Sequence, residues 1–224
     1  MSWLVALLWG GLVGLDATSF PQAMYSRPLV AATVTGLFFG RPLEGALIGV
    51  VLEFFALPVL PFGAAAYPES GTAAVAAAGA YFTVAGTRDD GLLLVAAVAA
   101  VLISHVAGYS VRLLRIHNAR IAHGLADADG RVEPDRLEHR HRAAIALDFV
   151  RGAAVTGAAA PVVVLILVAA ERLGWTAPLP PLLILATAGA VMVGSTLQVF
   201  GRARHHLVAF GVGAATGLLL LMVT

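Results

Sequence analysis

The sequence contains no cysteine and no lysine, and charged residues are scarce throughout its 224 residues. Without cysteine, disulfides, thiolate catalysis and cysteine-ligated metal or iron–sulfur centres are excluded. Charged residues make up 12% of the chain, against about 25% in a typical soluble domain. A net charge of +1 gives no reason to expect a nucleic-acid partner. With 59% hydrophobic residues, the composition predicts an integral membrane protein.

The sequence also lacks the motifs of common enzymes. It contains no G-x-x-x-x-G-K-[ST], no G-x-S-x-G and no kinase signature. Two histidine pairs, His139/His141 and His205/His206, lack the H-x-x-x-H spacing of a helical zinc site. The stretch DADGRVEPD resembles half a calcium loop, but Arg136 stands where the bidentate glutamate belongs, so a solvated turn is the better interpretation. We expect no enzymatic activity, bound metal or cofactor.

Long apolar runs are present instead, mainly in the second half of the chain. Each has about the 17–25 residues that a membrane helix needs. The run at residues 1–16 lacks a basic leader and a cleavage site, so we expect a retained first membrane segment. The pattern predicts an all-α polytopic membrane protein that forms a single membrane domain over residues 1–224. The later runs are residues 91–111, 152–170, 181–200 and 207–224.

One polar region, residues 112–142, separates the first two of these later runs. It contains seven Arg, four His and five acidic residues, and we expect a loop outside the hydrocarbon. Its Arg content places it in the cytoplasm by the positive-inside rule. Alternation of the spans then puts residues 87–90 and 171–180 outside and residues 201–206 inside.

Residues 1–86 form a less regular half, in which prolines and ionisable residues interrupt the apolar segments. Glu53 and Glu69 bracket the stretch EFFALPVLPFGAAAYPE, which contains three prolines. Backbone that leaves helical geometry inside a bilayer must be buried in protein or line a watery cavity. We therefore predict re-entrant hairpins and a binding site here, as in transporters with discontinuous helices, and regular spans over residues 91–224.

Ionisable residues at membrane depth each cost about 2.5–3.5 kcal/mol on insertion scales. Arg41 and Glu44 flank the predicted turn GRPLEG, so we expect a structural ion pair there. Glu53 and Glu69 adjoin the interrupted stretch, where a carboxylate could accept sugar hydroxyls or carry a coupling proton. His105 lies within a regular span and is expected to pack between helices.

Pairs of glycines with G-x-x-x-G spacing predict close approach of helix backbones. We expect close approach of backbones most strongly at the glycine cluster within residues 36–49. The pairs are Gly10/Gly14, Gly36/Gly40, Gly45/Gly49 and Gly213/Gly217.

Three segments of the first third resemble the IIC membrane subunit of the mannose/fructose/sorbose family of the bacterial sugar phosphotransferase system. They are LDATSFPQAMYSRPLVAATVTGLFFG (15–40), RPLEGALIGVVLEFFAL (41–57) and PFGAAAYPESGTAAVAAA (61–78). The family shows L-D … Q-x-M-x-S/H-R-P-L, then T-G-L/I-x-x-G, G-x-x-x-G-x-x-L-E and G-A-A-x-x-P-D/E in this order. Glu69 stands where many members have Asp.

This resemblance implies a subunit of the bacterial inner membrane that binds a hexose or amino sugar. Its expected partners are the IID membrane subunit, the soluble IIA and IIB phosphocarriers and the lipid bilayer, and IIC–IID pairs are expected to form homo-oligomers. The soluble partners carry out phosphoryl transfer. The alternatives are a stand-alone proton-coupled carrier and a non-transporting membrane scaffold. The residues that match the family's polar positions, and are our predicted sugar-binding set, are Asp16, Gln22, Arg27, Glu53 and Glu69.

Within this set we assign different roles. We expect Glu53 and Glu69 to accept hydrogen bonds from sugar hydroxyls and Gln22 to be a supporting ligand. Arg27 is expected to orient a carboxylate.

Overall fold

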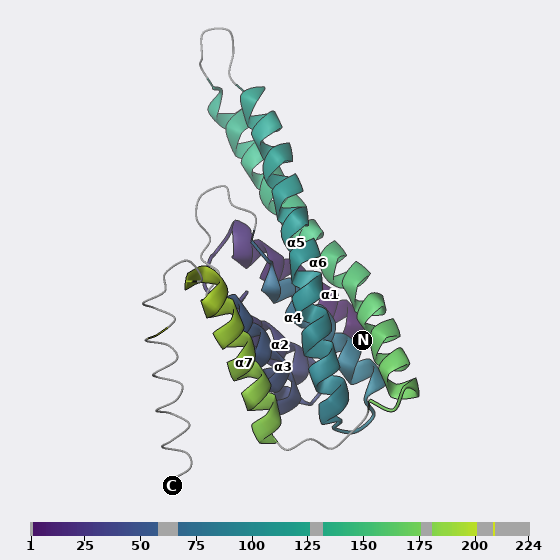
Figure 1. The fold of residues 1–224 in the computed structure, drawn as a ribbon. Coiled ribbons are helices and arrows are strands. Elements are labelled where there is room, and N and C mark those ends of the chain that lie inside the picture. The colour runs from purple at the N-terminus through teal and green to yellow at the C-terminus, as the bar shows by residue number, and fades with distance from the viewer. Residues whose placement is uncertain (1, 58–66, 126–131, 176–180, 201–207, 209–224) are drawn as a thin grey trace.

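The computed structural model describes residues 2–57, 67–125, 132–175, 181–200 and 208, and this part of the chain contains seven helices (Figure 1). They form a bundle from which two long helices protrude together. The predicted all-helical class is therefore confirmed for the described residues. The helices are α1 (Ser2–Thr18), α2 (Pro28–Phe38), α3 (Pro42–Ala56), α4 (Ser70–Val84), α5 (Asp90–His123), α6 (Pro134–Arg172) and α7 (Pro181–Phe200).

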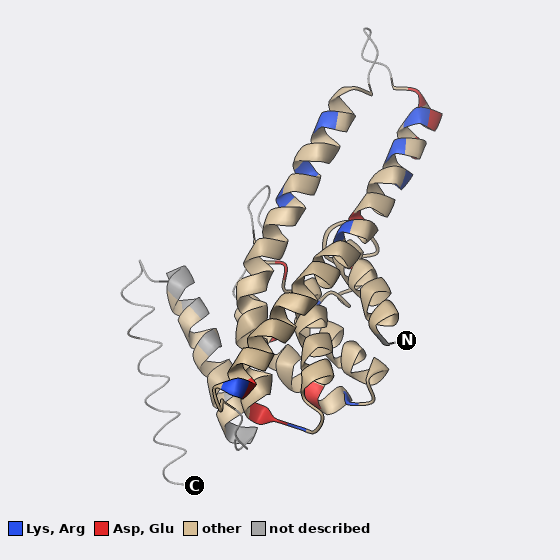
Figure 2. Ribbon diagram, turned by 90° about the vertical axis from the view of Figure 1, so that its right-hand side faces the viewer, with Lys and Arg blue, Asp and Glu red and all other residues tan. Residues whose placement is uncertain are grey.

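The long pair α5 and α6 contains the predicted spans 91–111 and 152–170. Among the described residues, these two helices are long and apolar enough to cross a membrane. Their 34 and 39 residues correspond to about 51 and 58 Å at 1.5 Å per residue, so both extend well beyond a hydrocarbon core of about 30 Å. Blue Arg positions follow the protruding arms in Figure 2.

The polar region 112–142 is helical over most of its described residues, because α5 and α6 both continue into it. That it lies in the cytoplasm stays a prediction. Helix α5 continues to His123, and α6 begins at Pro134 with proline in its first turn. Arg and Ala are good helix formers, and proline at the first position suits a helix start because its missing N–H needs no partner there. The calcium-like residues 126–131 lie outside the described part.

Helices α2 and α3 form a short hairpin. With 11 and 15 residues they are about 16 and 22 Å long, too short to cross a core of about 30 Å. Gly40, with φ +73°, makes the turn between them. A Cβ atom on Gly45 would lie 2.4 Å from the Ala32 carbonyl oxygen, and Gly36 and Gly49 also lie against backbone, which confirms the close packing at these three positions. A Cβ on Gly40 would meet no atom within 4 Å. That the hairpin is re-entrant stays a prediction.

The same close approach occurs between α1 and α6. A Cβ on Gly14 would lie 2.6 Å from Cα of Gly152, and one on Gly10 would overlap the Thr156 side chain. The Gly10/Gly14 prediction is therefore confirmed, whereas Gly213/Gly217 lies outside the described residues.

Helix α4 forms the centre of the bundle. Its residues from Ser70 to Tyr81 are all buried, and they are mainly alanine and glycine. Small side chains let α1, α2, α5 and α6 approach it closely, so the core has small residues where a soluble protein would often have large ones.

The end of the bundle away from the protruding hairpin is held by Arg41. Its guanidinium pairs with Glu44 at 3.1 Å and donates to the Ala85 carbonyl at 2.6 Å. It also lies over the Tyr81 ring, 5.2 Å from the centroid. The predicted structural ion pair is confirmed, and it fastens the α2–α3 turn to the end of α4.

Helix α7 occupies the predicted span 181–200 and packs against α3. The predicted span 207–224 and loop 201–206 fall almost entirely outside the described residues. The division of the chain into an irregular half and a regular half of one membrane domain stays a prediction.

Candidate functional site

Glu69 is buried at the start of α4, with 2% of the residue exposed. Its carboxylate faces Arg151 on α6, with Oε2 at 2.6 Å from Nη1 and Oε1 at 3.3 Å from Nη2. Its backbone N–H donates to the Ser104 carbonyl of α5 at 2.9 Å. Glu69 is thus attached to α6 through its carboxylate and to α5 through its backbone.

Arg151 connects Glu69 to three further groups. Its Nε donates to Asp148 Oδ1 at 2.8 Å, one turn earlier on α6. Its Nη1 donates to Ser110 Oγ at 3.0 Å, and its Nη2 to the Gly14 carbonyl at 3.2 Å. Paired and fully hydrogen-bonded charges are the form in which charge is tolerated in an apolar interior.

Asp148 is fully buried and is shared between α6 and the end of α1. One carboxylate oxygen accepts from Arg151, and the other accepts hydrogen bonds from the hydroxyls of Thr18 and Ser19. The same turn of α6 therefore contacts both Glu69 and the point where α1 ends.

A third buried carboxylate, Asp16, fixes the chain that follows α1. It accepts from the backbone N–H groups of Ala23 at 2.5 Å and Ser26 at 2.8 Å. Gln22 lies in this segment with φ +60°, a left-handed conformation that is uncommon for residues other than glycine. Asp16 thus shapes the backbone around Gln22, and a direct contact of either residue with sugar stays a prediction.

Arg27 and Glu53 form an ion pair across the α2–α3 hairpin, with Nε and Oε1 3.0 Å apart. The other carboxylate oxygen accepts from the Leu29 N–H at 3.3 Å. The Arg27 side chain is 46% exposed, against 9% for Arg151, so this pair faces an open side of the bundle.

A cavity of about 200 Å³ lies between these groups. Arg27 and Glu69 line it, and Glu53 adjoins it through its ion pair with Arg27. Asp16 and Gln22 do not line it. The structure thus brings three of the five predicted residues to one place. The lining residues are Ala17, Ser26, Arg27, Pro28, Ala56, Tyr67, Pro68, Glu69, Ser70 and Gly71.

Tyr67 closes one side of this cavity and is held by α5. Its hydroxyl accepts from Arg115 Nη2 at 2.9 Å, and the guanidinium lies 5.2 Å from the ring centroid. Gly108 lies directly against the Tyr67 carbonyl. The extended residues 67–69 are therefore attached to α5 along their whole length.

Sequence reasoning missed Asp148 and Arg151. The signal was present, because these two ionisable residues stand three apart in the apolar run AAIALDFVRGAAV. A predicted span that began at residue 152 excluded both. Three-residue spacing places them on one face of a helix, where they can act together.

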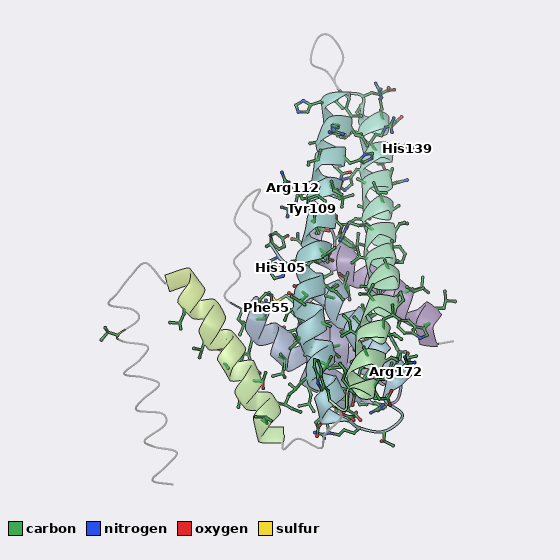
Figure 3. The ribbon with its side chains drawn as sticks, turned by 45° about the vertical axis from the view of Figure 1, so that its right-hand side comes forward. Phe55, His105, Tyr109, Arg112, His139 and Arg172 are labelled. Atoms are coloured by element: carbon green, nitrogen blue, oxygen red, sulfur yellow. The ribbon has the colours of Figure 1, made fainter. Side chains whose placement is uncertain are left out.

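His105 was expected to pack between helices, but it is exposed on α5. Its Nδ1 lies 2.9 Å from the Val101 carbonyl, and its ring lies 5.7 Å from that of Phe55 on α3. Figure 3 shows His105 with Tyr109 and Arg112 along one side of α5. His105 does not contribute to the cavity.

Among the described residues, no three His, Asp or Glu side chains are placed to hold a metal ion. The arrangement instead places two carboxylates, each ion-paired with an arginine, beside a small cavity in an apolar helical bundle. Carboxylates and guanidinium groups in such a place can bind hydroxyl groups by hydrogen bonds. These features define an apolar helical protein with a small cavity lined by polar and ion-paired side chains.

Comparison with known proteins places this protein in a family. The sequence model described as "PTS system sorbose-specific iic component" matches residues 1–203. The chain belongs to this family of membrane components, and the resemblance seen in the first third of the sequence is confirmed.

One curated relative is the "PTS system sorbose-specific EIIC component" of Lacticaseibacillus casei. The chain is 33% identical to it over 70 residues. This match covers 31% of the chain and 25% of the relative.

Proposed function

We propose that this chain is the sugar-translocating IIC subunit of a phosphoenolpyruvate-dependent phosphotransferase system, and that it binds a hexose or amino sugar in the cavity beside Glu69. The observation that carries the proposal is a buried, ion-paired carboxylate in the wall of a cavity of about 200 Å³. This volume lies below the range of about 300–1,000 Å³ for drug-sized ligands and suits a smaller, monosaccharide-sized one.

Both glutamates keep capacity for a sugar after their protein contacts are counted. An ionised carboxylate has about four lone-pair sites. Glu53 uses one for Arg27 and one for the Leu29 N–H, and Glu69 uses two for Arg151. The remaining lone pairs can accept from sugar hydroxyls.

The position of the cavity fits uptake into the cytoplasm. It lies where α1 ends and α2 and α4 begin. Its lining residue Tyr67 contacts Arg115 of the Arg-rich arm of α5, and the arms protrude from the bundle (Figure 2). With these arms in the cytoplasm, sugar in the cavity would be near the soluble IIA and IIB partners that phosphorylate it. A IID subunit in the inner membrane would complete the translocation unit, as homo-oligomers of IIC–IID pairs.

Sugar binding to the chain co-purified with its IID partner tests the proposal. Labelled glucose, mannose, fructose and sorbose are the probes, and the variants are Glu53→Gln and Glu69→Gln. We expect each variant to weaken binding at least tenfold, because a neutral amide is a poorer acceptor than a carboxylate. Glu138→Gln is the matched control, since Glu138 is an exposed ion-paired glutamate on the hairpin.

Two results would contradict the proposal. If both variants bound sugar with wild-type affinity, the two glutamates would not be part of the sugar site. Uptake that proceeds without IID and follows a proton gradient would favour a stand-alone proton-coupled carrier.

A further inference from the structure

We infer that Arg151 and Asp148 on α6 are the positioning residues of the sugar site. They contact Glu69 and the end of α1, and they hold the walls of the cavity in the arrangement that binds sugar. The inference rests on the proposed function, because it concerns the same cavity. Neither residue lines the cavity, so both would act through neighbours that do.

Arg151 fixes the direction of the Glu69 carboxylate. A guanidinium presents five N–H donors in a rigid planar fork. Here Nη1 and Nη2 each contact one oxygen of Glu69, and Nε contacts Asp148. Further bonds to Ser110 and the Gly14 carbonyl leave the guanidinium little freedom to rotate. The carboxylate it holds is therefore fixed before sugar arrives.

Asp148 extends this control to the other wall of the cavity. It accepts from the hydroxyls of Thr18 and Ser19, where α1 ends. The chain runs from there to Ser26 and Arg27, both of which line the cavity. One turn of α6 is thus bonded to the segments that form two walls, so a shift of this turn would change both walls together.

The charge balance makes the shape of Arg151 as important as its charge. Two buried carboxylates, Glu69 and Asp148, both form hydrogen-bonded ion pairs with the guanidinium of Arg151. A lysine would keep the positive charge, but its ammonium is a point charge and cannot face both carboxylates with the same fork geometry. Arg151→Lys therefore tests geometry while it avoids leaving two buried carboxylates without a cation.

The experiment measures the Kd of the labelled hexose that the wild-type IIC–IID complex binds, and the KM and maximal rate of uptake. We expect Arg151→Lys to raise Kd and KM about tenfold, the effect of weakened charge-assisted hydrogen bonds, with the maximal rate largely kept. Arg142→Lys is the matched control, because Arg142 is on the same helix in an exposed ion pair with Glu138. Its Kd should equal that of the wild type.

Thermal melting of each complex separates positioning from stability. An unchanged Kd in Arg151→Lys overturns the inference, and so does a loss of binding that only follows the loss of folded complex. A wild-type complex that binds neither the hexoses nor labelled glucosamine instead contradicts the proposed function, and the inference is overturned with it.

Discussion

The backbone of Tyr67 rests on Gly108 of α5, so closely that a Cβ atom on Gly108 would lie 2.2 Å from the Tyr67 carbonyl oxygen. No side chain fits in that space. Because Tyr67 and Pro68 directly precede Glu69, this contact holds the chain that leads into Glu69 against α5.

Gly108→Ala is therefore expected to displace residues 67–69 and weaken sugar binding about tenfold or more, since overpacking of this kind costs about 1–3 kcal/mol. Equilibrium binding of labelled hexose to the IIC–IID complex measures this. Gly189→Ala on α7, where an added Cβ meets no atom within 4 Å, is the control. Equal affinity in the two variants would show that the 67–69 backbone does not determine binding.

Tyr67→Phe removes the hydroxyl that accepts from Arg115 and keeps the ring beneath the guanidinium. Since a single hydrogen bond contributes about 0.5–1.5 kcal/mol, we expect affinity to fall by about two- to tenfold. Tyr67→Leu, which also removes the ring contact, should bind more weakly than Tyr67→Phe. Binding isotherms of the two variants decide this, and the reverse order would contradict the role given to the ring.

Arg41→Met should lower stability without changing sugar affinity. Arg41 fastens Glu44, Tyr81 and the Ala85 carbonyl at the end of the bundle away from the cavity. Loss of this partly buried cation is expected to cost about 1–3 kcal/mol, and melting of the complex will show it. Arg88→Met is a comparison at the same end, and its more exposed pair with Asp90 should cost less. A raised Kd for sugar in folded Arg41→Met would contradict the view that Arg41 affects stability and not the cavity at the other end of the bundle.

Gly45→Ala should separate α2 from α3. The added methyl would lie 2.4 Å from the Ala32 carbonyl oxygen, and backbone cannot yield as a flexible side chain can. We expect a lower melting temperature and weaker hexose binding, because Arg27 and Glu53 pair across this hairpin. Gly86→Ala, with open space around the new methyl, should behave like wild type. A melting temperature equal to that of Gly86→Ala would contradict the close packing.

Composition and segment length were enough to predict the helical class and the helices over residues 91–111, 152–170 and 181–200. They were not enough to set helix ends in residues 112–142, because charge content reports exposure to water and a solvated helix is as polar as a loop. Helix propensity and Pro134 contained the missing information.

The candidate site was predictable in part. Glu69 and Arg27 stand out as ionisable residues beside breaks in apolar segments, and both line the cavity. Arg151 was not found, because the predicted span began one residue after it. Its pairing with Glu69, 82 residues away in the chain, is a separate matter. Such a contact follows from how α4 and α6 pack, which no local pattern in the sequence records.

The protruding arms of α5 and α6 have a practical consequence. They extend far from the bundle (Figure 1), while Glu69 and the cavity lie within it. An antibody fragment or fused reporter placed on the distal arms would give a small, featureless membrane protein a visible orientation mark for electron microscopy. It would do so without touching the residues proposed to hold sugar.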